Sequence, residues 1–155
     1  MFTSAFILLS IVLAAFAALS IRHIPEGQVH SLYRLGKPAR LLGAGTHFVL
    51  PLVDRVVHKI QLGGQTLKFT DHFEADTAVR DVEGTVYWQV LEPERADCVI
   101  DQADELIRER LRDALRTDAA NDADFRAMNA RLKLAANAFL RERGMLVTRV
   151  DLSIA

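Results

Sequence analysis

The sequence predicts an α+β protein in which an N-terminal transmembrane helix is followed by a mostly antiparallel sheet with helices packed on one face. Three observations lead to this prediction. Residues 2–21 contain no charged side chain, residues 28–90 hold several short runs in which apolar and polar side chains alternate, and residues 93–143 repeat apolar side chains every three or four positions. A final alternating run over 146–154 has to pair with an earlier strand, because a lone terminal strand leaves its backbone groups unsatisfied.

Residues 2–21 form the predicted membrane anchor, since the first charged side chain is Arg22. Twenty helical residues at about 1.5 Å each span about 30 Å, the thickness of the hydrocarbon core of a bilayer. The few hydroxyl side chains are tolerated because serine can bond back to a carbonyl of its own helix. A cleaved signal peptide is the main alternative, because Ala15-Phe16-Ala17 fits an A-x-A cleavage site. The missing positive n-region and the long apolar run favour an uncleaved anchor.

Flanking charge predicts the orientation of a single-pass protein. No lysine or arginine precedes the span, and Arg22, Arg34, Lys37 and Arg40 follow it. The positive-inside rule therefore places the folded domain in the cytoplasm. The predicted division is an anchor over residues 1–21 and a folded domain over residues 22–155.

Strands are expected in the first part of this domain. Alternation predicts them over residues 28–34, 46–50, 56–62, 66–73 and 77–90. Glycine or proline separates most of these runs, as it does at Gly36-Lys37-Pro38, which is expected to break the chain into a turn.

The hydrophobic period changes at Pro93, which suits the first turn of a helix because its missing N–H is not needed there. A short helix is expected to follow, with an apolar face of Ala96, Val99 and Ile100. Asp101 is the expected N-cap of a second helix. A third helix is expected to begin after residue 122 and to end at Gly144.

Composition limits the class of protein. The chain has 155 residues, which is enough for one domain or one domain with a tail. Its 19 basic and 20 acidic residues nearly cancel, so a strongly basic nucleic-acid-binding protein is not expected. The single cysteine, Cys98, excludes an internal disulfide and a multi-cysteine zinc site, and its apolar neighbour Val99 predicts a buried thiol.

The reactive side chains form no pattern that is typical of an active site. The histidines lack a close metal-ligand spacing, no G-x-S-x-G occurs, and the acidic side chains near residues 71–83 fit solvated turns better than a cation site. The glycines at 43, 45, 63 and 64 lack the strand–glycine–helix context of a phosphate-binding loop. We therefore expect no catalytic residue, no cofactor, no metal ligand and no enzymatic activity. The side chains considered are His23, His30, His47, His58, His72, Ser31, Ser153, Asp71, Glu74, Asp76, Asp81 and Glu83.

Residues 101–143 contain nine basic and nine acidic side chains with interleaved signs. A solvated helical surface with pairs at i,i+4 explains this pattern most simply. A contact between copies, in which opposed charges fix the register, is the alternative.

Several segments, in the same order along the chain, resemble the SPFH or Band 7 family, the stomatin and prohibitin type of membrane protein. Residues 24–29 (IPEGQV) resemble the opening V-P-E-G-x-x-x-V, residues 35–37 (LGK) the element R-L-G-K, and residues 41–54 (LLGAGTHFVLPLVD) the element L-x-P-G-L-H-F-x-x-P-F-x-D. Residues 86–96 resemble V-x-Y-R-V-x-D-P-x-x-A, and residues 114–116 (ALR) match A-L-R. Residues 131–154 resemble the closing pattern R-x-x-x-x-L-x-x-x-x-x-x-x-G-I-x-V-x-x-V-x-I.

This resemblance implies a non-enzymatic, membrane-anchored scaffold that organises membrane patches or regulates neighbouring membrane proteins such as membrane proteases. It implies the lipid bilayer and either the protein itself or a longer SPFH paralogue as partners, with the helices of residues 93–143 as the partner surface. Typical members continue into a long heptad-patterned helix that drives ring assembly, whereas this sequence ends at Ala155, so we expect a short member that lacks the coiled coil. The apolar residues of 48–53 are expected in the sheet core, with contact to the membrane surface as the alternative.

Two other functions stay open. One is a secreted or periplasmic binding module whose signal peptide is removed. The other is an accessory subunit that joins the ring of a longer paralogue.

Overall fold

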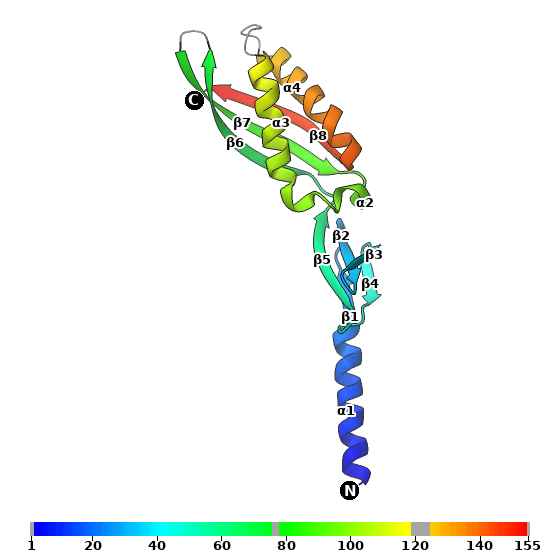
Figure 1. The fold of residues 1–155 in the computed structure, drawn as a ribbon. Helices are drawn as coiled ribbons and strands as arrows, with labels where there is room; N and C mark the ends of the chain where they lie inside the picture. The colour runs from blue at the N-terminus through cyan, green and yellow to red at the C-terminus, as the bar shows by residue number, and fades with distance from the viewer. Residues whose placement is uncertain (1, 76–77, 119–124, 155) are drawn as a thin grey trace. The chain divides into compact units, whose positions relative to one another are not determined.

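The structure is a computed structural model that describes residues 2–75, 78–118 and 125–154. It confirms the α+β class, with an apolar N-terminal helix, antiparallel sheets and helices packed on a sheet (Figure 1). The chain forms two compact units, Met1–Ile60 and Gln61–Ala155. The antiparallel strands lie in three separate small sheets, where the sequence analysis expected one.

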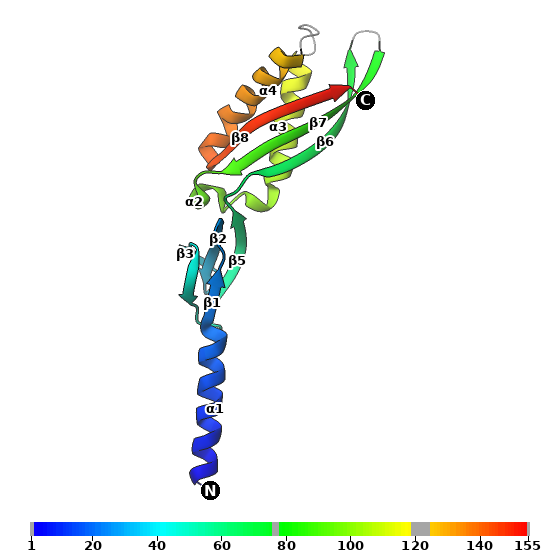
Figure 2. The same cartoon turned by 180° about the vertical axis from the view of Figure 1, so that it is seen from behind.

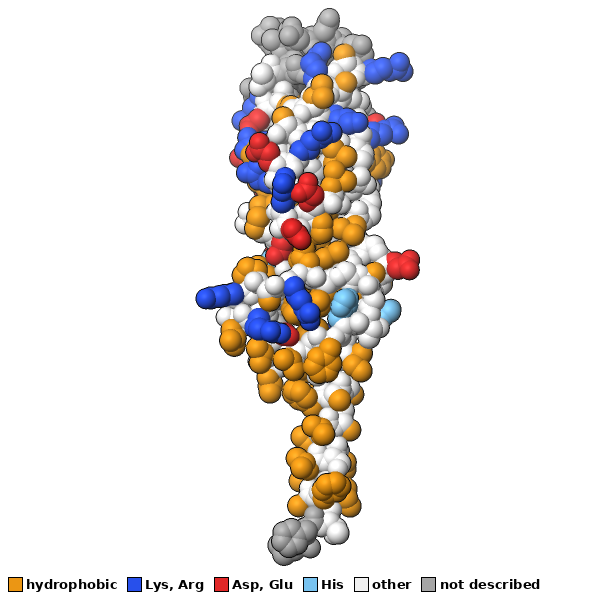
Figure 3. Space-filling view, turned by 90° about the vertical axis from the view of Figure 1, so that its right-hand side faces the viewer, with side chains coloured by type: hydrophobic (Ala, Val, Ile, Leu, Met, Phe, Trp, Pro, Cys, Tyr) orange, Lys and Arg blue, Asp and Glu red, His pale blue; other side chains and the backbone are white. Residues whose placement is uncertain are grey.

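Unit 1 begins with helix α1 (Phe2–Ser20), whose side chains are almost all exposed and apolar (Figure 3). Its serines bond back to the helix as expected, because Ser10 Oγ donates to Phe6 O (2.9 Å) and Ser20 Oγ donates to Phe16 O (2.8 Å). The helix ends one residue earlier than predicted, because β1 (Ile21–Ile24) begins at once and pairs with β4 (Gly45–Phe48).

A second sheet in unit 1 has the order β3-β2-β5, formed by β3 (Lys37–Leu42), β2 (Gln28–Arg34) and β5 (Asp54–Gln61). Strand β3 is not among the predicted strands, because Gly36-Lys37-Pro38 is typical of a turn. An edge strand tolerates proline, since the backbone N–H that proline lacks can face away from the neighbouring strand. The small core of unit 1 consists of Ile24, Leu32, Leu42 and Val49, with Val56 packed against it.

Unit 2 is built on a sheet of order β6-β7-β8, formed by β6 (Gln65–Ala75), β7 (Ala78–Val90) and β8 (Met145–Ile154). The last strand therefore pairs with an earlier one, as predicted. Helices α3 (Ala103–Asp118) and α4 (Phe125–Leu140) cover one face of this sheet (Figure 2). Over residues 82–90 of β7, where burial is described, the buried positions alternate as expected, and they are Val82, Gly84, Val86, Trp88 and Val90.

Two details of the helical region differ from the sequence analysis. The short helix α2 (Pro93–Ala96) is followed by the 3₁₀ turn η1 (Ile100–Gln102), which continues directly into α3. Asp101 lies inside that turn, so its prediction as the N-cap of α3 was wrong, because an N-cap needs an extended backbone. Cys98 is exposed rather than buried, because it lies in the loop after α2, where its thiol is 3.4 Å from Arg95 O.

The third helix ends as predicted. After α4 the 3₁₀ turn η2 (Arg141–Arg143) leads to Gly144, which has a left-handed backbone conformation. The predicted start of this helix, after Asn121-Asp122, lies outside the described residues.

Candidate functional site

The end of α1 is joined to the strands of unit 1 by backbone hydrogen bonds. The last carbonyls of a helix have no partner within the helix, and that of Ser20 accepts a bond from Val49 N (2.8 Å). In the β1–β4 pair, Ile21 lies directly opposite Phe48. The end of the apolar helix and the loop after β4 are therefore one structural unit, which we call the junction.

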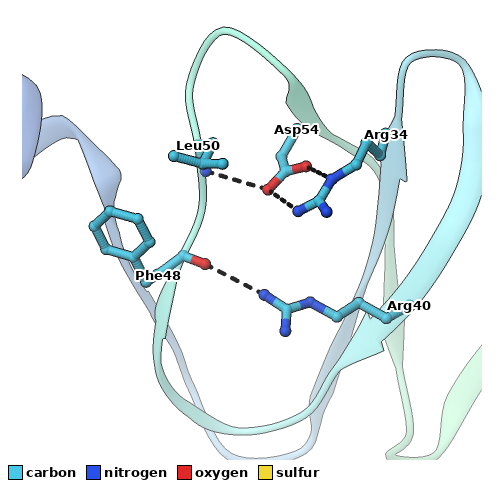
Figure 4. A network of polar contacts seen from close by, with 5 residues as sticks. All are labelled: Arg34, Arg40, Phe48, Leu50 and Asp54. Carbon is cyan, nitrogen blue, oxygen red and sulfur yellow. Dashed lines mark hydrogen bonds and ion pairs between the residues drawn. The ribbon is translucent and has the colours of Figure 1, made fainter.

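A bidentate ion pair lies beside the junction (Figure 4). Arg34 donates from Nε to Asp54 Oδ1 (2.7 Å) and from Nη2 to Asp54 Oδ2 (3.1 Å). Leu50 N donates to Asp54 Oδ2 (3.2 Å), and Arg40 Nη2 donates to Phe48 O (3.3 Å). The Asp54 side chain is 1% exposed and that of Arg34 is half exposed. Paired donors of this kind fix both the position and the orientation of a carboxylate.

This network shifts the pKa values of both charged groups. The hydrogen bonds from Arg34 lower the pKa of Asp54 against the opposing effect of burial, and the Leu50 N–H and the charges of Arg34 and Arg40 lower it further. The hydrogen bond and the negative charge of Asp54 raise the pKa of Arg34. Both groups are therefore charged at neutral pH.

The ion pair closes the loop of residues 50–54 against the turn between β2 and β3. Val53 N and Asp54 N both donate to Leu50 O, at 3.1 and 2.8 Å, and Leu35 N donates to Val53 O at 3.2 Å. Leu35 itself has a positive φ of 50°. Of the apolar residues at 48–53 that were expected in the sheet core, only Val49 is buried, so the expectation was wrong for Phe48, Leu52 and Val53, which are exposed.

The four histidines whose side chains are described do not come together into a site. His23 Nδ1 lies 3.3 Å from Thr46 Oγ1, His47 Nε2 lies 2.9 Å from Gly43 O, and the ring of His58 meets Tyr33 edge-on. Partial burial, and then the charge of Lys59, lower the pKa of His30. Among the side chains that the structure describes, which are those of residues 3–70, 82–117 and 126–153, no three from His, Cys, Asp or Glu lie close enough together to hold a metal ion.

Some of the candidate residues lie outside the described side chains. They are His72 and the acidic residues Asp71, Glu74, Asp76 and Asp81.

Helix α3 of unit 2 carries pairs of opposite charge along its exposed surface. Arg108 Nη1 lies 3.7 Å from Glu105 Oε2, and Arg110 Nη1 lies 3.7 Å from Asp113 Oδ2. Both pairs have a spacing of i,i+3. A solvated charged face explains such exposed pairs, which contribute little stability. An open groove of about 360 Å³ lies between α3 and α4, and its lining residues are Arg110, Asp113, Ala114, Thr117, Arg131 and Ala135.

Two comparisons with known proteins gave a match. A family model described as "SPFH domain / Band 7 family" matches residues 22–151 of this chain. Uncharacterized protein C16G5.07c of Schizosaccharomyces pombe is 22% identical to this chain over 100 residues, which cover 63% of this chain and 28% of the yeast protein.

Proposed function

Because this chain belongs to the SPFH/Band 7 family, we propose that it is a membrane-anchored, non-enzymatic scaffold. It organises a patch of membrane or regulates neighbouring membrane proteins such as membrane proteases. SPFH domains are generally non-catalytic scaffolds, and members of the family are commonly membrane-associated and oligomeric. The domain division that goes with this function is an anchor over residues 1–21 and an SPFH domain over residues 22–155.

Helix α1 is the observation that carries the proposal. It has 19 residues with no charge, and it is the one helix among the described residues that is long and apolar enough to cross a membrane. A soluble helix of this composition would be buried in a core, whereas the side chains of α1 pack against almost nothing else in the chain. A bilayer is the environment that suits such a surface.

Charge supports a cytoplasmic domain. Unit 1 carries six basic side chains after α1 (Arg22, Arg34, Lys37, Arg40, Arg55 and Lys59) and two acidic ones (Glu26 and Asp54). An excess of basic residues close to a membrane span favours the cytoplasmic side.

The proposed partners are the bilayer, a second copy of this chain or a longer SPFH paralogue, and a membrane protein such as a protease. The helices of unit 2 are the proposed surface for the protein partners, since α3 presents charges of both signs to solvent. No nucleic-acid partner is proposed, because the chain as a whole has a net charge of -1.

The test is to express the full chain with a C-terminal tag, extract the membranes with alkaline carbonate, and measure the native mass of the detergent-solubilised protein. The scaffold proposal predicts an intact chain that resists carbonate and forms a large assembly. A membrane-bound monomer would instead favour an accessory subunit of a longer paralogue. A trimmed chain in the soluble fraction would favour the secreted binding module and would contradict both the anchor and the orientation.

A matched pair of variants makes the test specific for α1. Val12→Arg places a cation near the middle of the helix, where transfer into the bilayer costs about 2.5–3.5 kcal/mol. It is expected to move a substantial share of the protein into the carbonate supernatant. Val12→Leu keeps the helix apolar and is expected to stay in the pellet.

A further inference from the structure

Unit 1 exposes a group of large apolar side chains at the junction, in addition to those of α1. Leu52 is 85% exposed, Leu35 is 80% exposed, and Phe48 and Ile21 are each more than half exposed. The group, completed by Val53, is here called the apolar base.

The members of the apolar base come from different segments that the backbone brings together. Ile21 and Phe48 lie opposite each other in the β1–β4 pair. Leu35 N bonds to Val53 O, which places the β2–β3 turn against the loop that carries Leu52. Val49 N bonds to the last carbonyl of α1, so the whole group lies at the end of unit 1 where the helix emerges. Figure 3 shows hydrophobic side chains gathered on unit 1 next to α1.

The local structure holds these side chains outward. Leu35 adopts a left-handed backbone conformation, which is costly for a leucine and which glycine or asparagine would adopt more easily. The Arg34–Asp54 ion pair and the Leu50 N–H bond hold the loop that displays Leu52. Contiguous exposed apolar groups are rare on soluble surfaces and commonly mark a contact with protein or membrane.

Two arginines lie next to members of the apolar base. Arg22 is exposed next to Ile21, and the guanidinium of Arg40 bonds to the carbonyl of Phe48. Asp54, one of the two acidic residues of unit 1, is already paired with Arg34. An apolar surface bordered by arginines matches the boundary between acyl chains and anionic headgroups.

We propose that the apolar base inserts among the headgroups of an anionic phospholipid bilayer, with Arg22 and Arg40 contacting lipid phosphates. This inference rests on the proposed function, because α1 is what brings the base to the bilayer. It adds a second membrane contact that fixes how unit 1 lies on the surface.

The test uses the full chain with Cys98→Ser, since Cys98 is the one native cysteine. An environment-sensitive fluorophore is attached in turn to Leu52→Cys, Leu35→Cys and the control Val57→Cys. Val57 is a partly exposed apolar residue on β5, three positions beyond the start of that strand at Asp54. Each protein is reconstituted in nanodiscs of phosphatidylcholine with phosphatidylglycerol. Quenching by a nitroxide on the lipid is compared with quenching by aqueous iodide.

Positions 52 and 35 are expected to be quenched by the lipid nitroxide and shielded from iodide, whereas position 57 is expected to show the reverse. Iodide quenching at 52 and 35 equal to that at 57 would overturn the proposal. Shielding from both quenchers would also overturn it, because a protein partner would then cover the base. Carbonate extraction of the same samples tests the membrane anchor α1 separately. A protein that resists carbonate but has an iodide-accessible position 52 would support the anchor and contradict this inference.

The proposed preference for anionic lipid is tested by a separate comparison. The double variant Arg22→Gln/Arg40→Gln is expected to lose most of the additional lipid quenching that phosphatidylglycerol gives over pure phosphatidylcholine. Lys59→Gln removes an exposed cation from the far part of β5 and is expected to retain it. Equal quenching in both lipid mixtures for the labelled protein that keeps Arg22 and Arg40 would overturn the role given to the arginines.

Discussion

The side-chain amide of Asn137 satisfies both backbone polar groups of Val147. Asn137 Nδ2 donates to Val147 O (2.9 Å), and Val147 N donates to Asn137 Oδ1 (2.7 Å). Strand β8 is the edge of its sheet, so none of the described strands pairs with these groups on its outer side. The Asn137 side chain of α4 therefore makes the two hydrogen bonds that a neighbouring strand would make to Val147. These bonds fix α4 against the edge of the sheet.

Replacing Asn137 by alanine is expected to destabilise unit 2 by about 2–4 kcal/mol, because it leaves a buried N–H and a buried C=O without partners. Trp88 is the one tryptophan, is buried and lies opposite Val147, so its fluorescence reports unfolding at this place during a urea titration. Asn129→Ala is the matched control on the same helix. Asn129 Oδ1 has no hydrogen-bond partner among the described residues, so the control is expected to change stability by less than about 0.5 kcal/mol. Equal losses in the two variants would contradict the bridging role.

Gly144→Ala is expected to destabilise the chain by about 2 kcal/mol or more. Gly144 has φ 72°, and a Cβ at this position would collide with the backbone oxygen of Glu92. Because Gly144 O also accepts bonds from Leu91 N and Glu92 N, the backbone has little freedom to move away. Gly64→Ala, where nothing lies near the added carbon, is the control for the same urea titration. A Gly144→Ala protein as stable as the control would show that the close approach of the two segments is not needed.

Acidification is expected to loosen the loop of residues 50–54 through Asp54. The pKa of this carboxyl in the folded chain is below its ordinary value of 3.8, so its contribution is present above pH 3.8 and is lost as the pH falls through the lowered value. The protection of the 50–54 amides against hydrogen exchange, measured relative to the intrinsic rate at each pH, should therefore fall at low pH. Asp54→Asn should show fast exchange already at neutral pH and little further response to acid. Glu26→Gln, at an exposed carboxylate of the same unit, is the control and should behave like the unchanged chain.

Local sequence patterns were sufficient for most of the fold. The predicted strand at 28–34 has the observed bounds, and Gly144 was identified as the end of the third helix. Both predictions use properties of neighbouring residues, namely period-two alternation and the ease with which glycine adopts a left-handed conformation. Strand β3 could not be found in this way, because its Pro38 is acceptable only at a sheet edge and the edge is set by long-range pairing.

The site was harder to predict than the fold. Arg34 precedes one segment that resembles the family and Asp54 is the last residue of another. Alternation predicts which face of a strand is buried, but it does not predict which polar side chains meet when they are twenty residues apart. The apolar residues at 48–53 were assigned to the core on their composition. Only the closed loop, held by Asp54 and by the Leu35–Val53 backbone bond, turns Leu52 outward.

The choice between a retained anchor and a signal peptide can be tested with Ala17→Leu. Signal cleavage needs small residues at the A-x-A site, so a leucine at this position would block it. In a retained anchor the side chain of residue 17 is exposed on α1, where a larger apolar group faces lipid and is tolerated. The anchor proposal therefore predicts that the unchanged chain and Ala17→Leu both keep their full N-terminus, as measured by intact mass and by recovery of the N-terminal peptide. An unchanged chain that loses about 17 residues beside an intact Ala17→Leu variant would show that residues 2–21 act as a cleaved signal. The cytoplasmic orientation and the membrane contact of the apolar base would then both be withdrawn.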